Sequence, residues 1–207
     1  MWLVLVAALP VQAREPVVEQ LELQRDVEGL TLTARLGADI PPAVEDALLR
    51  GIPLYFVWRA ELYRERWYWT DKRVATVVRT MRLAYQPLTR QWRLSLAAEP
   101  AASGASLQYA VHQSFDTLTE ARTAITRLVR WRLARADDLE AGEHYRVELQ
   151  FGLDLSLLPR PFQIGLRNQP DWDIELQRNM LVPRTVAPVV EPPLGGDRGD
   201  TSTANGR

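Results

Sequence analysis

Residues 53–69 read PLYFVWRAELYRERWYW, and the alternation in this segment is the clearest indication of the fold class. Apolar side chains recur at every second position from Leu54 to Leu62, and the positions between them, from Tyr55 to Tyr63, mix aromatic and charged side chains. Side chains of a β-strand point alternately to its two faces, so this pattern predicts a long strand with one buried and one partly covered face. Such a strand favours a fold built on sheets.

The same period of two continues on both sides of this stretch. Upstream, alternating apolar residues flank a polar break at residues 25–29, which predicts a hairpin with one buried face. Downstream, a second hairpin is expected around the turn sequence Gln86-Pro87-Leu88-Thr89. The other expected elements are a loop at residues 99–106 and strands at residues 107–111, 145–155 and 172–176.

Two segments carry the signals of helices instead. Residues 41–50 begin with two prolines, which suit a first helical turn, and they follow a candidate cap at Asp39. Thr117 and Glu120 have the spacing of a capping box, which predicts that a second helix begins there and covers residues 118–135. Its apolar positions keep helical spacing and its other surfaces are basic: Leu118, Ala121, Ile125, Leu128 and Val129, against Arg122, Arg127, Arg130, Arg132 and Arg135. That basic surface is interpreted either as a solvated face or as a contact for an anionic partner.

Short turns between neighbouring strands favour antiparallel pairing over a doubly wound parallel sheet. We therefore predict a mainly β fold for residues 15–183, an antiparallel β-sandwich-like or α+β single domain with two peripheral helices. The order strand, helix, long strand occurs twice, which an internal duplication would explain.

The two ends of the chain differ from this pattern. Residues 1–13 read MWLVLVAALPVQA, an apolar run that ends in small residues at the spacing a signal peptidase cleaves. No Lys or Arg precedes the run, so either the true start lies upstream or the run is an uncleaved hydrophobic terminus; we expect cleavage after Ala13 and export to the periplasm. Apolar runs are too short to span a bilayer, so no membrane segment is expected in the mature chain. Residues 184–207 predict a disordered tail, in which Arg198-Gly199-Asp200 is expected to be a chance triplet.

Composition limits the partners. The 207 residues have a formal net charge of -1, so the overall positive field that attracts nucleic acid is missing, and no nucleic-acid partner is expected. Cysteine is absent, so packing alone must stabilise the fold in an oxidising compartment. Basic residues are almost all arginine, with Lys72 the single lysine, which reflects either carboxylate recognition or codon composition.

Catalytic chemistry has few candidates in the sequence. His112 and His144 are the two histidines, and neither has a third metal ligand at a recognisable spacing. The sequence contains no Gly-x-Ser-x-Gly motif and no Gly-rich phosphate loop. We therefore predict no catalytic residue, no metal site and no cofactor, and we favour a chain that is not an enzyme.

The most distinctive local feature is a run of three aromatic residues flanked by charges. The candidate binding residues are Arg66, Trp67, Tyr68, Trp69 and Asp71. Aromatic faces give contact area at a low entropy cost, so the cluster suits stacking on a sugar or gripping a peptide. The other interpretation is a strand end whose alternating rings pack on both faces. Residues 156–164 likewise fit either a recognition loop or a rigid crossover between strands.

These segments resemble a known family over residues 15–183. The residues that carry the resemblance are Gly51-Ile52-Pro53-Leu54 with residues 55–62, Arg66-Trp67-Tyr68-Trp69-x-Asp71, Ser156-Leu157-Leu158-Pro159-Arg160-Pro161-Phe162-Gln163 and Asp171-Trp172. The family consists of uncharacterised exported proteins of proteobacteria, classified only as a domain of unknown function. The resemblance implies a secreted single-domain protein, often encoded near a nitrogen-regulation-type membrane sensor kinase, and it brings no catalytic residue with it.

Two function hypotheses follow from these observations. The first is a non-catalytic interaction module of the periplasm, linked to membrane sensor-kinase signalling, that holds a membrane or periplasmic protein with the aromatic cluster. The second is a carbohydrate- or lipid-binding envelope protein, or a hydrolase acting on such material. A deep aromatic-lined pocket with converging carboxylates would favour the second hypothesis.

Overall fold

The computed structural model describes residues 16–68, 70–97, 109–158 and 169–185. The strands are β1 (Val17–Asp26), β2 (Gly29–Gly37), β3 (Leu54–Arg64), β4 (Lys72–Gln86), β5 (Gln91–Ala97), β6 (Tyr109–Phe115), β7 (Arg127–Arg135), β8 (Tyr145–Leu153) and β9 (Glu175–Leu181). The helices are α1 (Pro42–Leu49) and α2 (Leu118–Ile125), with short 3-10 turns η1 (Ala136–Asp138), η2 (Leu155–Leu157) and η3 (Pro170–Trp172).

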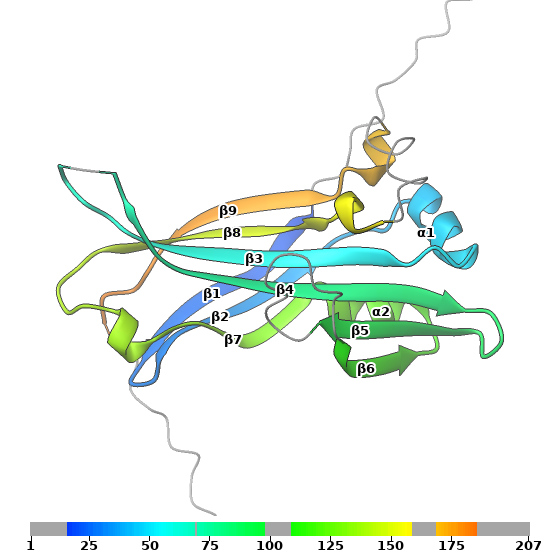
Figure 1. Cartoon of the computed structure of the whole chain (residues 1–207), viewed down its shortest axis with the longest axis horizontal. Coiled ribbons are helices and arrows are strands. Elements are labelled where there is room, and N and C mark those ends of the chain that lie inside the picture. The colour runs from blue at the N-terminus through cyan, green and yellow to red at the C-terminus, as the bar shows by residue number, and fades with distance from the viewer. Residues whose placement is uncertain (1–15, 69, 98–108, 159–168, 186–207) are drawn as a thin grey trace, which may run out of the picture.

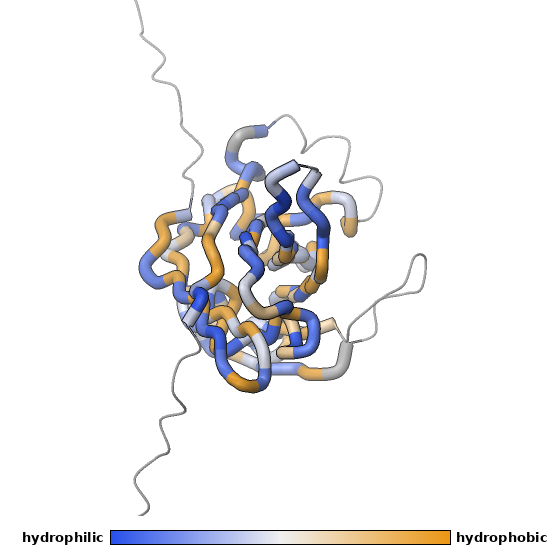
Figure 2. Tube along the Cα trace, turned by 90° about the vertical axis from the view of Figure 1, so that its left-hand side faces the viewer, coloured by the Kyte–Doolittle hydropathy of each residue, from blue (hydrophilic) through white to orange (hydrophobic). Residues whose placement is uncertain are grey.

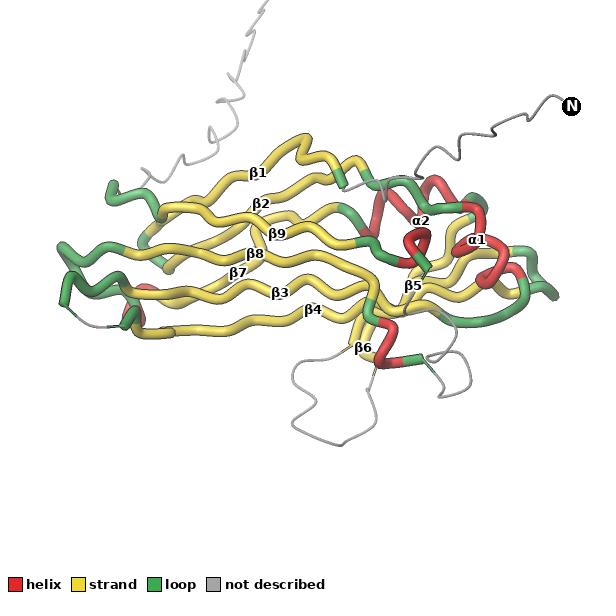
Figure 3. The backbone as a smooth tube through the Cα atoms, turned by 90° about the horizontal axis from the view of Figure 1, so that it is seen from above, coloured by secondary structure: helices red, strands yellow, loops and turns green. Residues whose placement is uncertain are grey.

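The strands form two antiparallel sheets, one behind the other (Figure 1). The larger sheet has the order β6-β5-β4-β3-β8-β9, and the smaller has the order β1-β2-β7. Seen from above, the strands run along the long axis of the molecule, and α1 and α2 gather at one end (Figure 3). The predicted fold, mainly β and sandwich-like with two peripheral helices, is confirmed.

Alternation along the strands creates the core between the sheets. On β3, every second side chain from Leu54 to Leu62 is buried, and β8 repeats this pattern from Tyr145 to Phe151. Hydrophobic and hydrophilic residues accordingly alternate along much of the trace (Figure 2). The inward side chains of the two sheets join in one hydrophobic cluster, and removal of this apolar surface from water is the main force that holds the layers together.

Trp58 joins the larger sheet to the end of α2. Its side chain on β3 is fully buried and packs against the Phe151 ring with the ring centroids 4.6 Å apart. Its indole Nε1–H donates a hydrogen bond of 2.9 Å to the carbonyl of Ile125, the last residue of α2. Carbonyls at the end of a helix have no partner within that helix, so the indole satisfies a group that would otherwise be buried without a hydrogen bond.

The second helix is shorter than predicted. α2 keeps the predicted capping box but ends at Ile125, and residues 127–135 form strand β7 instead of continuing the helix to Arg135. The β2–β7 pairing shifts register twice, and each bulge adds a residue to β7, so that the inward-facing Leu128 and Trp131 lie three apart. This spacing imitates the helical period, and for that reason the prediction was wrong. The five arginines expected on a helix therefore lie on α2 and on β7.

The long strand also ends earlier than predicted. β3 stops at Arg64, and the chain turns at Trp67 and Tyr68 before β4 begins. The interpretation of these two rings as a strand end packed on both faces is therefore wrong. Near the C-terminus, Trp172 lies in the 3-10 turn η3, and the last strand begins at Glu175.

Asp39 does not cap α1. The N-cap position is Pro41, without a side-chain cap hydrogen bond, and the Asp39 carboxylate instead pairs with Arg122 of α2 at 3.0 Å. The segment before α1 is thereby joined to α2.

Several predicted segments lie outside the described residues. These are the signal peptide at residues 1–13, the loop at residues 99–106, Pro159 to Ile164 of the proline-containing segment, and the tail from residue 186. Within the part of the chain that the structure describes, no helix combines the length and the apolar character needed to cross a bilayer.

We predict that Trp58→Phe destabilises the protein more than Trp92→Phe does. Both substitutions remove similar ring volume from buried sites, and the described residues offer no hydrogen bond to the Trp92 indole. Only Trp58→Phe leaves the Ile125 carbonyl unsatisfied, which costs about 1–2 kcal/mol more. Urea unfolding of the two variants measures the difference, and equal losses would contradict the role given to the indole hydrogen bond.

We also predict that Gly29→Ala is strongly destabilising. Gly29 has φ 138° and starts β2, where an added Cβ would lie 2.2 Å from the carbonyl oxygen of Ala134 on β7. The matched control is Gly142→Ala, at φ 81° with no atom within 4 Å of the added Cβ. Thermal unfolding should show a loss of about 1 kcal/mol for the control and at least about 2 kcal/mol more for Gly29→Ala.

Candidate functional site

The aromatic residues singled out in the sequence lie at the tip of the β3–β4 hairpin. We call residues 66–71 the aromatic tip; Trp69 within it lies outside the described residues. The two strands separate after the cross-strand pair Arg64 and Lys72, so the tip projects beyond the sheet (Figure 1). The structure thus brings Arg66, Trp67, Tyr68 and Asp71 into one turn.

The base of the aromatic tip is closed by Asp71. One carboxylate oxygen, Oδ1, accepts a hydrogen bond of 3.3 Å from the backbone N–H of Arg66. The other, Oδ2, accepts a hydrogen bond of 2.9 Å from Nη2 of Arg146 on β8. A carboxylate that bridges the two ends of the loop and a neighbouring strand restricts the positions the loop can adopt.

Arg146 is itself held from several sides. Its guanidinium lies 5.2 Å from the centroid of the Tyr63 ring and forms an ion pair with Glu148. Tyr63 donates a hydrogen bond to Glu61. The cluster lies on the outer face of the larger sheet, where Tyr63 and Arg146 are cross-strand partners and Glu61 and Glu148 are the next such pair.

The charges of this cluster shift its titrations. The hydrogen bond from Arg146, followed by the one from the Arg66 N–H, lowers the pKa of Asp71. The hydrogen bonds to Asp71 and Glu148 raise the pKa of Arg146. At neutral pH the ion pair between Asp71 and Arg146 is therefore fully charged.

The two described rings of the aromatic tip face solvent. Trp67 is 94% exposed and Tyr68 is 68% exposed. The rings contact each other edge to face, with centroids 4.9 Å apart and planes at 73°. Neither ring belongs to the hydrophobic core cluster, so the described structure gives them no part in holding the sheets together.

Sequence reasoning found the aromatic residues but missed the cluster that supports them. Arg146 and Glu148 are outward positions on a clear strand, and an outward arginine is most often solvated. Only the strand register places Arg146 beside Tyr63 and within reach of Asp71. The only signal in the sequence was that both strands carry charged residues at outward positions, and it did not indicate that the two strands pair.

A second candidate site is an open depression on the outer face of the larger sheet. Its volume is about 260 Å³, and its floor is Gly152, which has no side chain. Arg59, Asp154, Asp173 and Glu175 line it. Phe151, the aromatic residue of the lining, points into the core and is 1% exposed. The depression offers carboxylates but no exposed aromatic surface on which a sugar could stack.

The two histidines have separate partners. His112 Nδ1 lies 2.9 Å from Oγ of Ser95, its cross-strand partner on β5. The Ser95 residue is 1% exposed, which leaves its hydroxyl out of reach of a substrate. His144 forms a hydrogen bond with Arg184. Over the described ranges, no three His, Cys, Asp or Glu side chains are grouped as a metal ion would need.

Comparison with known proteins adds a family. Residues 13–181 match the model of the family described as Domain of unknown function (DUF4390). A search of the curated proteins and a search of the solved structures found no match. The matched region includes the whole aromatic tip and Arg146, so the site lies within the part of the chain that the family model covers.

We predict that Arg146→Gln raises the pKa of Asp71 toward its ordinary range. The folded pKa is lowered, so ionised Asp71 supports the aromatic tip at neutral pH, and this support is lost as the pH falls through the lowered pKa. An NMR titration of side-chain carboxyl carbons measures the shift. Arg93→Gln, on β5, is the control and should leave the titration of Asp71 unchanged. An equal effect of both variants would contradict the role given to the ion pair between Arg146 and Asp71.

Proposed function

Because the chain belongs to the DUF4390 family, which is described only as a domain of unknown function, we propose its function from the geometry of the aromatic tip. The protein is a non-catalytic interaction module of the periplasm. It binds a protein partner through Trp67 and Tyr68, with Arg66 and Asp71 beside them. The observation that carries the proposal is the near-complete exposure of Trp67 on a loop whose base is clamped.

Exposure of these rings has an energetic consequence. A large side chain that gains little from folding can release water when a partner covers it, and a buried tryptophan or tyrosine often dominates the energy of an interface. Because Asp71 and Arg146 already hold the loop, less conformational entropy is lost on binding. The aromatic tip therefore has the two properties of a preformed anchor, available apolar area and a restrained base.

The charges around the rings favour a protein over an anionic bilayer. Arg66 and Lys72 are balanced by Glu65 and Asp71 within the same turn. A loop that docks on anionic lipid usually carries a basic excess, which this turn lacks. A mixed rim of both signs around an aromatic centre is the common composition of a protein interface.

The proposed compartment rests on the apolar run at residues 1–13 and its small residues before Arg14. The proposed partner is a membrane protein with a domain facing the periplasm, of the sensor-kinase class that the family resemblance implies. In that role the protein would be an accessory to envelope sensing. The alternative of a carbohydrate- or lipid-binding protein loses support because the depression at Gly152 has no exposed aromatic lining.

We predict that the double variant Trp67→Ala, Tyr68→Ala loses the partner. The tagged protein is crosslinked in intact cells of its own host and purified from the periplasmic fraction. Recovery of a reproducible membrane partner should fall at least about tenfold in the double variant, as expected for the loss of an aromatic anchor.

The matched control is Leu88→Ala. Leu88 is fully exposed at the turn between β4 and β5, so the control removes an exposed apolar side chain from another hairpin. It should leave recovery unchanged. If the double variant kept every partner of the unmodified protein, the aromatic tip would not be the binding site.

A further inference from the structure

The outer face of the smaller sheet carries two opposed rows of charge. β1 provides an acidic row of Glu19, Glu22 and Asp26, and β7 provides an arginine row of Arg127, Arg130, Arg132 and Arg135. Between them, β2 contributes Thr31, Thr33 and Arg35. The face is therefore negative along one edge and positive along the other.

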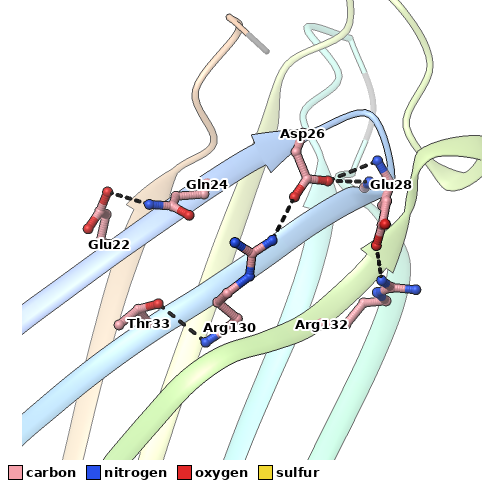
Figure 4. Close-up of polar contacts among 8 residues, drawn as sticks. Glu22, Gln24, Asp26, Glu28, Thr33, Arg130 and Arg132 are labelled. Atoms are coloured by element: carbon pink, nitrogen blue, oxygen red, sulfur yellow. Dashed lines mark hydrogen bonds and ion pairs between the residues drawn. The ribbon is translucent and has the colours of Figure 1, made fainter. Parts of the chain in front are cut away.

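Part of this charge is neutralised within the chain. Arg130 reaches across β2 to Asp26, with 3.5 Å between Nη2 and Oδ2, and Arg132 pairs with Glu28 of the β1–β2 turn (Figure 4). Both arginine side chains stay more than half exposed. Each guanidinium can therefore also bind the carboxylate of another molecule.

Another part of the charge is left unpaired. Arg35 and Arg127 are directly opposite each other on β2 and β7, and neither has an ion pair among the described residues. Like charges at opposed cross-strand positions destabilise a sheet unless an anion lies nearby. Glu19 lies one strand away, with its carboxylate over Gly37 on the same face.

The register places acids and arginines at equal heights. Glu22 pairs with Thr33, whose hydroxyl accepts the backbone N–H of Arg130 at 3.3 Å. Asp26 pairs with Gly29, which pairs in turn with Arg135. At the levels of Thr33 and Gly29 the face therefore has a carboxylate on β1 and a guanidinium on β7, on either side of β2. At the two levels of Thr31 and Arg35, β1 carries the neutral Gln24 and Gln20.

This arrangement is self-complementary. Two such faces can pack against each other about a two-fold axis that lies between them and runs parallel to β2. This rotation places β1 of one copy over β7 of the other. It leaves the position of each residue along the strand direction unchanged. Glu22 then meets Arg130, Asp26 meets Arg135, and Glu19 approaches Arg127 of the second copy. The two-fold repeats each contact, as in an isologous interface.

We propose that the protein forms a two-fold dimer through the outer face of the β1-β2-β7 sheet. The occupant of the face is a second copy of the chain, and the contacts are acid–arginine pairs between β1 of one protomer and β7 of the other. The partner's Glu19 supplies the anion that the Arg35–Arg127 pair lacks.

The size of the face sets the strength of the dimer. β2 has 9 residues and the sheet has three strands, so at about 3.3 Å per residue and about 4.8 Å between strands the face covers about 430 Å² in each copy. Two such faces bury less than a standard stable interface, and charged contacts at a solvated face are screened by salt. The dimer is therefore weak and dissociates as ionic strength rises.

The dimer has a consequence for partner binding, which rests on the proposed function of the aromatic tip. The aromatic tip and the β1–β2 turn lie at the same end of the sandwich (Figure 1). An axis that runs along the strands leaves both aromatic tips pointing in one direction. A partner that is itself a dimer could then be held by two anchors at once, which raises its apparent affinity without new contacts.

The test is sedimentation velocity of the purified chain, from micromolar to submillimolar concentration, at low and high salt. The unmodified protein should dimerise at low salt and dissociate at high salt. Glu22→Arg and Arg130→Glu should each raise the dimer dissociation constant by about tenfold or more, because like charges then face each other. The double variant Glu22→Arg, Arg130→Glu restores opposite charges and should return the constant to within about threefold of the original.

Two controls carry equal charge changes elsewhere. Arg93→Glu lies on β5 and Glu175→Arg on β9, both in the larger sheet, and neither should alter dimerisation. Circular dichroism confirms that each variant is folded. A chain that stays monomeric at low salt, or a dimer that the single reversals do not weaken, would overturn the proposal, and so would a double variant that stays monomeric.

The outcome is independent of the aromatic tip. Trp67→Ala removes a side chain that is not part of the dimer face, so its dimerisation should equal that of the unmodified chain. Loss of a cellular partner with an intact dimer would concern the proposed function alone. Loss of the dimer with partner binding retained would concern this inference alone.

Discussion

The hydrogen bond from the Trp58 indole to the Ile125 carbonyl joins the parts of the fold that the chain order separates. The chain leaves the larger sheet after β6, passes through α2 and enters the smaller sheet as β7, and Ile125 marks that crossing. Trp58 belongs to β3, next to the centre of the larger sheet. The residue therefore holds the crossover against the larger sheet, while the backbone hydrogen bond from Leu36 N–H to the Thr126 carbonyl joins the crossover to β2.

The same strand links this anchor to the aromatic tip. β3 runs from the buried Trp58 to Arg64, where the hairpin leaves the sheet, and its outer face carries Tyr63 beside Arg146. The inner face of β3 thus packs in the core, and the end of the strand at Arg64 leads into the aromatic tip that makes the proposed contact. A rigid central strand positions an exposed loop more accurately than a loop between mobile elements would.

Much of the fold could be predicted because burial imposes a period of two on β3 and β8. The prediction was wrong where a local irregularity changed that period, since the bulges of β7 put Leu128 and Trp131 three residues apart. The candidate residues Trp67 and Tyr68 were found from composition alone, but their exposure depends on where β3 ends. Arg146 and the two charged rows could not be found, because cross-strand neighbours are set by register, and no local pattern reports the register between β8 and β3 or between β7 and β2.

The bulges of β7 also limit the addition of further strands at the edge of the smaller sheet. Among the described strands β7 pairs only with β2, so its other edge presents backbone groups that a further strand could join. Two register shifts, with Arg130 in a left-handed conformation at φ 45°, interrupt the even row of donors and acceptors that such addition requires. Growth into a fibre by edge-to-edge pairing is disfavoured at this edge, which protects a chain that contains no cysteine and so has no disulfide to hold it closed.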